Sequence, residues 1–338
     1  MSVTTATQAP PAPHTSEAID RAMRKRRLLN LMLDYGLYAA LVSLVVYFSI
    51  ASPYFLSTRN LLNIAMAIAV TGILAAGFTA ALIAGQVDIS IGATVGLSGV
   101  VFAVLQEQAG LPWFVAALVS IAVGMVTGML SGLLVILVSI NSLIATLAMS
   151  MLITGIGLIL AEGQPIPLTD GTLGSIINAR PLGIPIPVIV LAVVFAVGWV
   201  VFNRMRLGWH VYAVGANPSA ALRAGINVNR ICLGLFVLSG GLAALGGLIS
   251  TGQGGSAFPG SGDALAFQVL AAVLLAGFGI SGGVGKFERA LVGVLLVGVL
   301  LNGLVLMQVE PYYQYLARGV IFVLAVVLAS VSLRKAAR

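Results

Sequence analysis

Residues 84–92, Ala84-Gly85-Gln86-Val87-Asp88-Ile89-Ser90-Ile91-Gly92, interrupt a long apolar region of the chain. Asp88 is the only formal charge between Arg59 and Glu107. A carboxylate at membrane depth is costly unless it faces a polar cavity or a partner, so Asp88 should not face lipid. The flanking glycines allow a sharp turn, and non-helical backbone survives in a bilayer only where protein or water satisfies it. The stretch therefore predicts a broken helix that lines an interior space.

A second interpretation of the same stretch is purely structural. Asp88 or Ser90 can cap the helix that follows, and capping alone would explain both the charge and the glycines. The two interpretations are compatible, because a capping carboxylate can also face a cavity.

The composition indicates an integral membrane protein. Of the 338 residues, 59% are hydrophobic and only 8% are charged, whereas a soluble globular domain has about a quarter charged residues. One cysteine, Cys232, and two isolated histidines, His14 and His210, give no basis for an internal disulfide or a metal site. The net charge of +7 follows the predicted membrane topology, so it does not indicate a nucleic-acid partner.

The chain divides into a tail, residues 1–27, and a single membrane domain, residues 28–338. The tail is rich in Thr, Ala and Pro, has no apolar period, is expected to be disordered, and ends in a basic cluster at 21–27. No short apolar region with a cleavage site follows the cluster, so a retained first helix is favoured over a signal peptide. At about 20 residues per span, we expect an all-α protein of about ten transmembrane helices. They are placed at 31–51, 61–84, 89–106, 113–138, 142–161, 186–202, 231–251, 264–279, 289–307 and 315–333.

The basic residues set the expected orientation. With both termini in the cytoplasm, fourteen Lys and Arg residues fall inside and only three, Arg59, Arg180 and Arg318, fall outside. An odd number of spans would place the C-terminal basic residues opposite the N-terminal cluster and is disfavoured.

Glycines inside the predicted helices indicate close helix packing. They recur at a spacing of four or five in several spans, as in Gly124, Gly128 and Gly132. Residues 276–283, Ala-Gly-Phe-Gly-Ile-Ser-Gly-Gly, weakly echo residues 84–92 but lack the carboxylate, which hints at the internal repetition common in transporters.

Two loops stand out. Residues 203–230 are predicted to be cytoplasmic and to contain a short helix that begins at Asn217-Pro218-Ser219 and is stopped by Gly225. Such a helix can sit in another protein's groove, or it can lie on the lipid headgroups with Arg223 facing phosphate. Residues 162–187 are rich in Pro and Gly but partly apolar, so we expect them to fold over the outer ends of the helices.

Polar and aromatic side chains within the spans are candidates for a solute path. Phe267 beside Gln268 pairs an aromatic face with a hydrogen-bonding group, as a sugar-like solute would need. Each polar group taken singly is more often an interhelical hydrogen bond, and Asn141 can simply mark a helix end. The candidates are Gln86, Asp88, Ser90, Asn141, Phe267, Gln268 and Asn302.

Catalytic constellations are absent from the sequence. It has no GxxxxGK[ST] loop and no credible Ser/His/Asp set, so no enzymatic activity and no cofactor are expected. If ATP energises transport, another subunit must bind the nucleotide.

Three motifs, in order along the chain, resemble the permease subunits of ribose-type (monosaccharide) ABC importers. Gly85-Gln86-Val87-Asp88-Ile89-Ser90-Ile91-Gly92 is similar to that family's G-x-I-D-L-S-V-G. Residues 212–217 through 225–228 are similar to its Y-A-x-G-x-N…S-G-I-x-V loop, and residues 282–285 leading to 301–304 are similar to G-G-x-G…N-N-G-L. Two departures are Ala266-Phe267-Gln268, where many members carry Glu-Leu-Asp, and Leu222-Arg223-Ala224-Gly225, where Arg-Leu-Ser-Gly is usual.

The resemblance implies a permease of the bacterial inner membrane. It would form a dimer with a second copy or a paralogue, bind two ATPase subunits through cytoplasmic coupling helices, and receive solute from a periplasmic binding protein. Residues 213–226 become the expected coupling segment, with Asp88 in the translocation core. The coupling candidates are Ala213, Gly215, Asn217, Ala221, Arg223 and Gly225.

Two rival functions are kept. One is a proton-coupled secondary transporter with Asp88 as the relay, although a relay usually involves more than one intramembrane ionisable group. The other is a non-transporting scaffold, because glycine-rich helices do not require a pathway.

Overall fold

The computed structural model describes residues 35–336, with side chains described from 35 to 327. The predicted tail, residues 1–27, lies outside the described residues, as does the expected start of the first helix at residue 31. The chain is helical apart from its loops and one pair of two-residue strands. After a first helix at Tyr35–Ala51, the elements are α2 (Thr58–Ile83), α3 (Ile91–Ala103) with a π-helical turn (Val104–Gln108), α4 (Trp113–Val138), α5 (Ser142–Leu160), β1 (Ile166–Pro167), α6 (Thr172–Asn178), a 3-10 turn (Pro181–Gly183), α7 (Ile186–Arg204), α8 (Arg206–Ala216), α9 (Pro218–Arg223), α10 (Val228–Gly254), β2 (Ser256–Ala257), α11 (Asp263–Leu275), α12 (Arg289–Leu306) and α13 (Pro311–Ala336).

The chain is a multi-pass membrane protein. Among the described residues, seven helices are long and apolar enough to cross a bilayer, and α3 with its π-helical turn counts as one of them. Three shorter apolar helices, Tyr35–Ala51, Asp263–Leu275 and Pro311–Val327, accompany them. The ten-span topology remains a prediction.

Several predicted helix bounds were wrong. The span expected at 264–279 ends at Leu275, because Gly277 adopts a φ of +89° that leaves the helical region. The span expected at 231–251 is longer at both ends, since Asn227 caps α10 by accepting a hydrogen bond from the Arg230 N–H. α13 begins at Pro311, four residues before the expected start, because proline is well suited to the first position of a helix.

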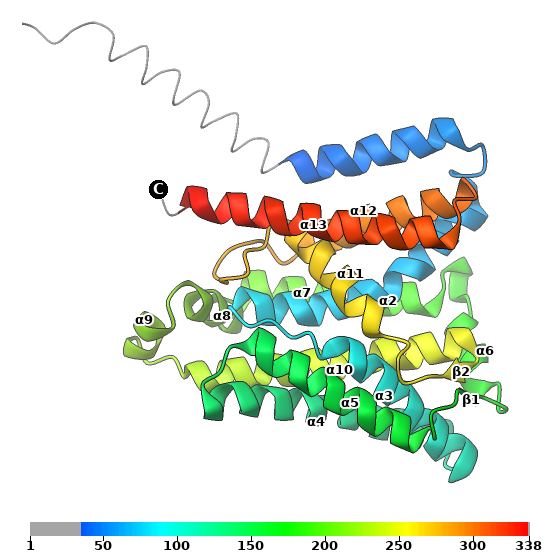
Figure 1. Cartoon of the computed structure of the whole chain (residues 1–338), viewed down its shortest axis with the longest axis horizontal. Coiled ribbons are helices and arrows are strands. Elements are labelled where there is room, and N and C mark those ends of the chain that lie inside the picture. The colour runs from blue at the N-terminus through cyan, green and yellow to red at the C-terminus, as the bar shows by residue number, and fades with distance from the viewer. Residues whose placement is uncertain (1–34, 337–338) are drawn as a thin grey trace, which may run out of the picture.

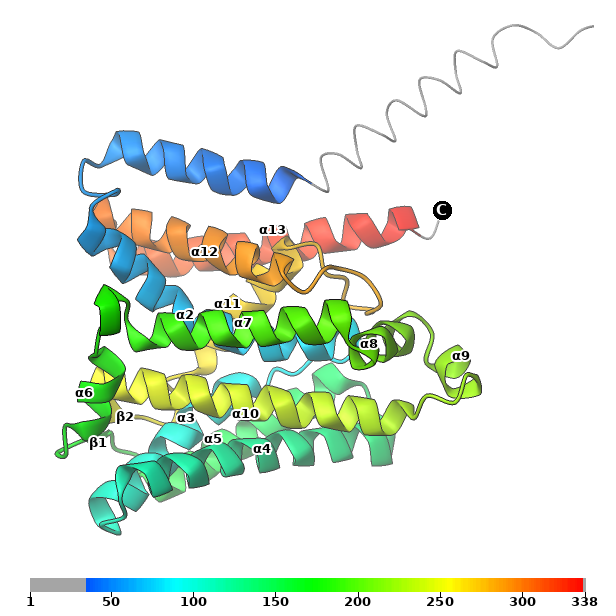
Figure 2. The same cartoon turned by 180° about the vertical axis from the view of Figure 1, so that it is seen from behind.

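Helix α2 lies at the centre of the bundle. It contacts α7, α10, α11 and α12, and its residues from Val70 to Ile83 are all buried. Helices α8 and α9 lie at one end of the bundle, whereas α6 and the strand pair lie at the opposite end (Figures 1 and 2). The start of the first described helix and the end of α13 lie at the α9 end (Figure 1). The loops predicted on opposite sides of the membrane are therefore at opposite ends of the molecule.

Glycine lets α4 and α10 pack with their backbones in contact. A Cβ added at Gly128 would lie 2.2 Å from the Phe236 carbonyl oxygen, and one added at Gly124 would lie 2.6 Å from the Gly240 carbonyl oxygen. Such distances are far shorter than a van der Waals contact, so only glycine fits. The helix-packing role predicted for these glycines is confirmed.

The loop of residues 162–187 covers one end of the helices, as expected. β1 pairs with β2 in antiparallel register, Ile166 opposite Ala257, which joins this loop to the segment after α10. The Gln106 amide donates a 2.8 Å hydrogen bond to Asp170, and Thr169 donates to Glu107. The Asp170 carboxylate accepts hydrogen bonds from the Thr172 hydroxyl and N–H and from the Gln106 amide. These bonds, those from Thr172 most strongly, hold the pKa of the Asp170 carboxyl below its usual value.

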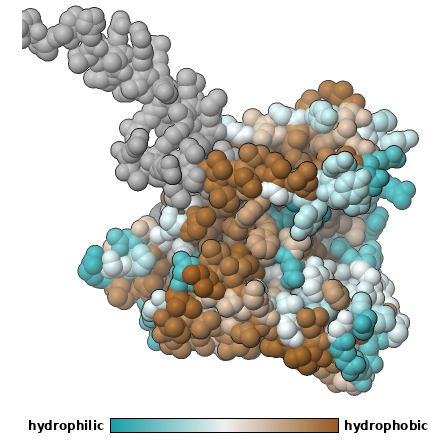
Figure 3. All heavy atoms as spheres, in the orientation of Figure 1, coloured by the Kyte–Doolittle hydropathy of each residue, from teal (hydrophilic) through white to brown (hydrophobic). Residues whose placement is uncertain are grey.

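The surface fits a lipid environment. Hydrophobic residues cover much of the left and centre of the face drawn in Figure 3, and paler and hydrophilic residues become frequent toward its right-hand end. Ile159 and Leu137, on neighbouring helices, are 78% and 76% exposed. In water such side chains would be a large apolar patch, whereas acyl chains solvate them.

The α4–α10 contact generates a stability prediction. Gly128→Ala should lower the free energy of unfolding by about 1–3 kcal/mol, because the added methyl group must push two backbones apart. Thermal unfolding of the purified protein, followed by a dye that reacts with the buried Cys232 thiol as it becomes exposed, measures the change. Gly234→Ala is the matched control, since a Cβ there meets nothing within 4 Å. Equal melting temperatures for both variants would contradict the packing.

Candidate translocation and coupling site

The chain is non-helical between Ile83 and Ile91, as predicted, and side chains of α5 satisfy its backbone. The Val87 N–H donates to Ser142 Oγ at 3.0 Å, and the Ile89 N–H donates to Thr146 Oγ1 at 3.1 Å. Both hydroxyls come from the first turns of α5, where they are four residues apart and share a helix face. The first turns of α5 thus replace the helical hydrogen bonds that the break removes.

Asp88 is enclosed by protein and joins the break to α10. It is 1% exposed, which confirms that it does not face lipid. Its Oδ1 accepts from the Ser90 N–H at 3.1 Å and from the Ser90 hydroxyl at 2.5 Å. Its Oδ2 accepts from the Ser239 hydroxyl of α10 at 2.7 Å. Both carboxylate oxygens therefore have donors, as a buried charge requires.

The capping interpretation is correct in part. Ser90 is the N-cap residue of α3, but its side chain makes no capping hydrogen bond. Its hydroxyl donates to Asp88 instead and lies 3.2 Å from the Ser131 hydroxyl of α4. Asp88 accepts the Ser90 N–H, so the carboxylate stabilises the turn that starts α3.

A hollow of about 490 Å³ lies beside the break. From the break and the start of α3 it is lined by Ile89 and Gly92, and from α11 by Asp263, Ala266 and Phe267. Asp88 is not among its lining residues. This hollow is open to the surface, because Met151, which also lines it, is 78% exposed. The break therefore lies beside a hollow that Asp88 does not face, and the interior space stays a prediction.

The turn between α11 and α12 packs directly on this break. The Gly283 N–H donates to the Ile83 carbonyl at 2.8 Å, at the end of α2. A Cβ added at Gly282 would lie 2.4 Å from the Gly85 nitrogen. The two segments that echo one another in sequence, residues 84–92 and 276–283, are therefore in backbone contact.

Helix α8 presses on both segments. A Cβ added at Gly215 would lie 1.9 Å from the Ile83 carbonyl oxygen and 2.5 Å from the Gly283 nitrogen. The Tyr212 hydroxyl donates to the Gly285 carbonyl at 2.9 Å. Partial burial, and next the charge of Glu288, raise the pKa of the Tyr212 phenol, so it keeps the proton that it donates. A displacement of α8 must therefore either move residues 84–90 with it or disrupt these contacts.

Helix α9 follows α8 as a short exposed element. Asn217 is its N-cap and accepts from the Ala220 N–H at 3.0 Å, as predicted. It ends before Gly225, which has a φ of +84°, and the Ile226 N–H donates back to the Ala221 carbonyl at 3.0 Å. Leu222 is 64% exposed. A hollow of about 530 Å³ beside the helix is lined by Pro218, Ser219, Leu222, Gly225, Ile226, Asn227, Val228 and Asn229.

The remaining predicted residues separate into structural and open positions. Asn141 caps α5 by accepting from the Leu143 N–H at 2.9 Å. Asn302 and Asn60 exchange two hydrogen bonds of 3.0 Å between α12 and α2. Gln86 is half-buried beside Gly85.

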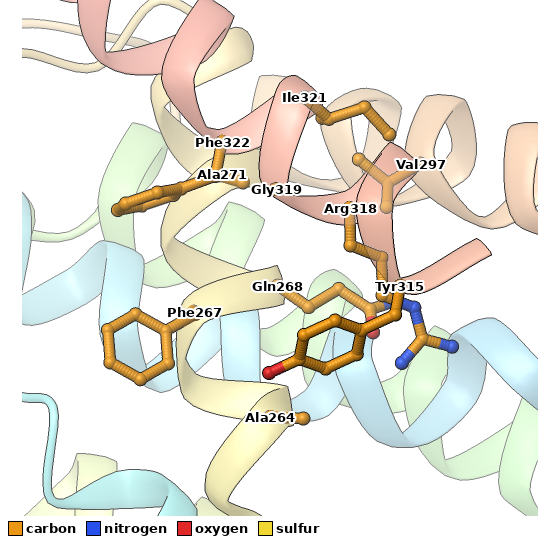
Figure 4. Close-up of a pocket in the computed structure, with 10 residues that line it drawn as sticks. All are labelled: Ala264, Phe267, Gln268, Ala271, Val297, Tyr315, Arg318, Gly319, Ile321 and Phe322. Atoms are coloured by element: carbon orange, nitrogen blue, oxygen red, sulfur yellow. The ribbon is translucent and has the colours of Figure 1, made fainter. Parts of the chain in front are cut away.

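Phe267 and Gln268 lie on α11 and help to line a second hollow, of about 230 Å³, between α11 and α13 (Figure 4). Phe267 is 47% exposed and Gln268 is half-buried. The structure thus places both beside open space, whereas Asn141 and Asn302 make local structural bonds.

Sequence reasoning missed several residues of the site. Ser239 and Ser131 are isolated hydroxyls in apolar helices, and nothing in their neighbourhood marks them as partners of Asp88 and Ser90. The Tyr212 phenol could have been suspected, because it begins the motif that continues through Asn217. Tyr315 and Arg318, which line the second hollow, come from a helix that the motifs do not include.

Comparison with known proteins identifies the class. Residues 60–326 match the family described as the permease component of branched-chain amino acid transport systems, and the chain belongs to this family. It is 34% identical to the ribose import permease of Haemophilus influenzae over 87% of this chain and 92% of that protein. It is 34% identical to the ribose import permease of Bacillus subtilis, over 93% and 98%, and 35% identical to the D-allose transport permease of Escherichia coli strain K12, over 87% and 90%. No solved structure gave a significant match.

The Asp88–Ser239 bond generates a prediction. Ser239→Ala should lower the free energy of unfolding by about 1–3 kcal/mol, because it leaves one oxygen of a buried carboxylate without its donor. Ser98→Ala is the matched control, since this buried hydroxyl donates only to carbonyls of its own helix. The Cys232 dye assay measures both. If the two variants have the same melting temperature, the hydrogen bond from Ser239 to Asp88 does not stabilise the protein.

Proposed function

We propose that the chain is the membrane-spanning subunit of an ABC importer that moves a monosaccharide or related polyol from a periplasmic binding protein to the cytoplasm. The observation that carries the proposal is membership of a permease family over residues 60–326, together with relatives named for ribose and D-allose import. The protein would lie in the bacterial inner membrane and form a dimer with a second copy or a paralogue. Its termini would be cytoplasmic, and ATP would be hydrolysed by partner subunits.

The α8–α9 segment, within the predicted loop 203–230, supports this role. We assign α9 and its hollow as the surface that receives the ATPase, because Leu222 is an exposed apolar side chain on a helix fixed by caps at both ends. Asn217 and Gly225 form those caps, Ala221 is buried beneath them, and Arg223 is exposed. Ala213 packs against the core from α8, next to the close contact of Gly215.

A mechanical route follows from these contacts. Movement of α9 by a partner ATPase would displace α8, which abuts the Ile83 carbonyl and the Gly283 nitrogen. Because those groups lie at the end of α2, next to the break, and in the turn between α11 and α12, the motion reaches the centre of the bundle, where Asp88 and Ser90 tie the break to α10 and α4. Switching between outward and inward access would use this connection.

The rival proton relay receives less support. All the hydrogen bonds that Asp88 accepts come from Ser90 and Ser239. Serine does not titrate, so within the described residues the bonded chain offers no second ionisable group to take the proton.

Reconstitution tests the function. The chain, its cognate ATPase and its binding protein are inserted into proteoliposomes, and uptake of labelled ribose, allose and xylose is measured with ATP supplied to the nucleotide-binding side. We expect ATP-dependent uptake of one of these sugars or a related polyol, and ATP hydrolysis that rises when loaded binding protein is added. An ATPase subunit unable to hydrolyse ATP is the control. Uptake that persists without ATP and collapses with an uncoupler would instead establish the relay.

The coupling surface generates a separate prediction. Leu222→Glu should abolish co-purification of the ATPase, because it puts a charge at the centre of the proposed apolar contact. Leu182→Glu is the control, since Leu182 is fully exposed on the external loop and should leave co-purification unchanged. Retention of the ATPase by the Leu222 variant would place the docking surface elsewhere.

A further inference from the structure

The hollow between α11 and α13 has two chemically different ends (Figure 4). At one end the rings of Phe267 and Phe322 meet edge to face, with centroids 6.0 Å apart and planes at 82°. At the other end the side chains of Gln268, Tyr315 and Arg318 converge, on the opposite side of α11 from Phe267 (Figure 4). The hollow thus has an aromatic end on one side of α11 and an end with an amide, a phenol and a guanidinium on the other.

Membrane energetics argue that this hollow holds water. Arg318 is seven residues from Pro311 at the start of α13, which places it about 10 Å along the helix axis. So near the outer end of the expected span, a guanidinium turns to water, to the headgroups or into a polar cavity and not to the acyl chains. The lining residues within the described part of the chain include Arg318 and no carboxylate. Water or a polar solute is therefore the partner that the lining leaves available.

Phe267 is shared by this hollow and the one beside the helix break. It lines both, and in the second hollow its neighbours include Ile89 and Gly92 of the break region and Asp263 of α11. The hollow beside the break, of about 490 Å³, lies within the roughly 300–1,000 Å³ usual for ligand pockets, and the hollow between α11 and α13, of about 230 Å³, is somewhat smaller. The two hollows therefore meet at one aromatic side chain.

We propose that the two hollows are consecutive parts of a water-accessible path for a polyhydroxylated solute, divided by the Phe267–Phe322 pair. The aromatic pair would contact the apolar face of the solute, while Gln268, Tyr315 and Arg318 would hydrogen-bond its hydroxyl groups. The solute class rests on the function proposed above. The water-accessible path does not, because it follows from the lining residues alone.

Cysteine accessibility tests the path. Cys232 is the only native cysteine, so a Cys232→Ala background permits single cysteines at Gln268, Tyr315 and Arg318. A membrane-impermeant methanethiosulfonate is applied to the assembled complex in proteoliposomes. We expect these positions to react at least about ten-fold faster than lipid-facing controls, because the reagent attacks the thiolate, which forms only where water reaches. The controls are Leu316→Cys and Val320→Cys, which are exposed on the same helix but outside the hollow.

The outcomes separate the path from the proposed function. The cysteines at positions 268, 315 and 318 could instead react no faster than Leu316→Cys and Val320→Cys in variants that still bind the ATPase. That result would overturn the path and would mean that lipid or a second copy fills the hollow. Fast labelling in a complex that fails to import sugar would support the path and contradict the function.

During ATP-driven uptake, the sugar that the complex imports should slow labelling at Gln268→Cys by several-fold, while a sugar that the same uptake assay has shown not to be imported should leave the rate unchanged. An unchanged rate with the imported sugar would overturn the solute contact.

Discussion

The fold depends on satisfying the backbone that the break in the chain exposes. Residues 84–90 leave the helical conformation inside an apolar bundle, where unpaired N–H and C=O groups cost several kcal/mol each. Ser142 and Thr146 of α5 accept the N–H groups of Val87 and Ile89. This bonding fixes α5 against the break. The Asn141 cap starts α5 at Ser142 and so sets the position of both hydroxyls along the helix.

The close approach of three backbones depends on the same break. Residues 83–85, 282–283 and 215–216 approach so closely that a Cβ at Gly215, Gly282 or Gly283 would overlap a main-chain atom. Main-chain contacts of this kind have no flexible side chain that can absorb a displacement. In the proposed mechanism, a force on α9 would act on α8 and reach the centre of the bundle through these main-chain contacts. The proposed coupling helix α9 itself has only six residues.

The sequence predicted the class, the break and the short helix, because each has a local signature. Composition indicates a membrane protein, Asp88 between glycines marks the break, and Asn217-Pro218 with Gly225 marks both ends of α9. It did not predict the partners of Asp88, because Ser239 lies 151 residues away and only tertiary packing brings it close. The end of α11 was misjudged for a related reason: the apolar run continues past Leu275, while the conformation of Gly277 stops the helix.

The Asn60–Asn302 pair restricts how this protein can diverge. The two amides exchange a donor and an acceptor across 242 positions of the chain. Losing one partner strands two polar groups, whereas exchanging both for apolar residues of the same shape can be nearly neutral. A substitution at only one of the two positions therefore gives a less stable protein. Residues 60 and 302 should therefore covary among related sequences.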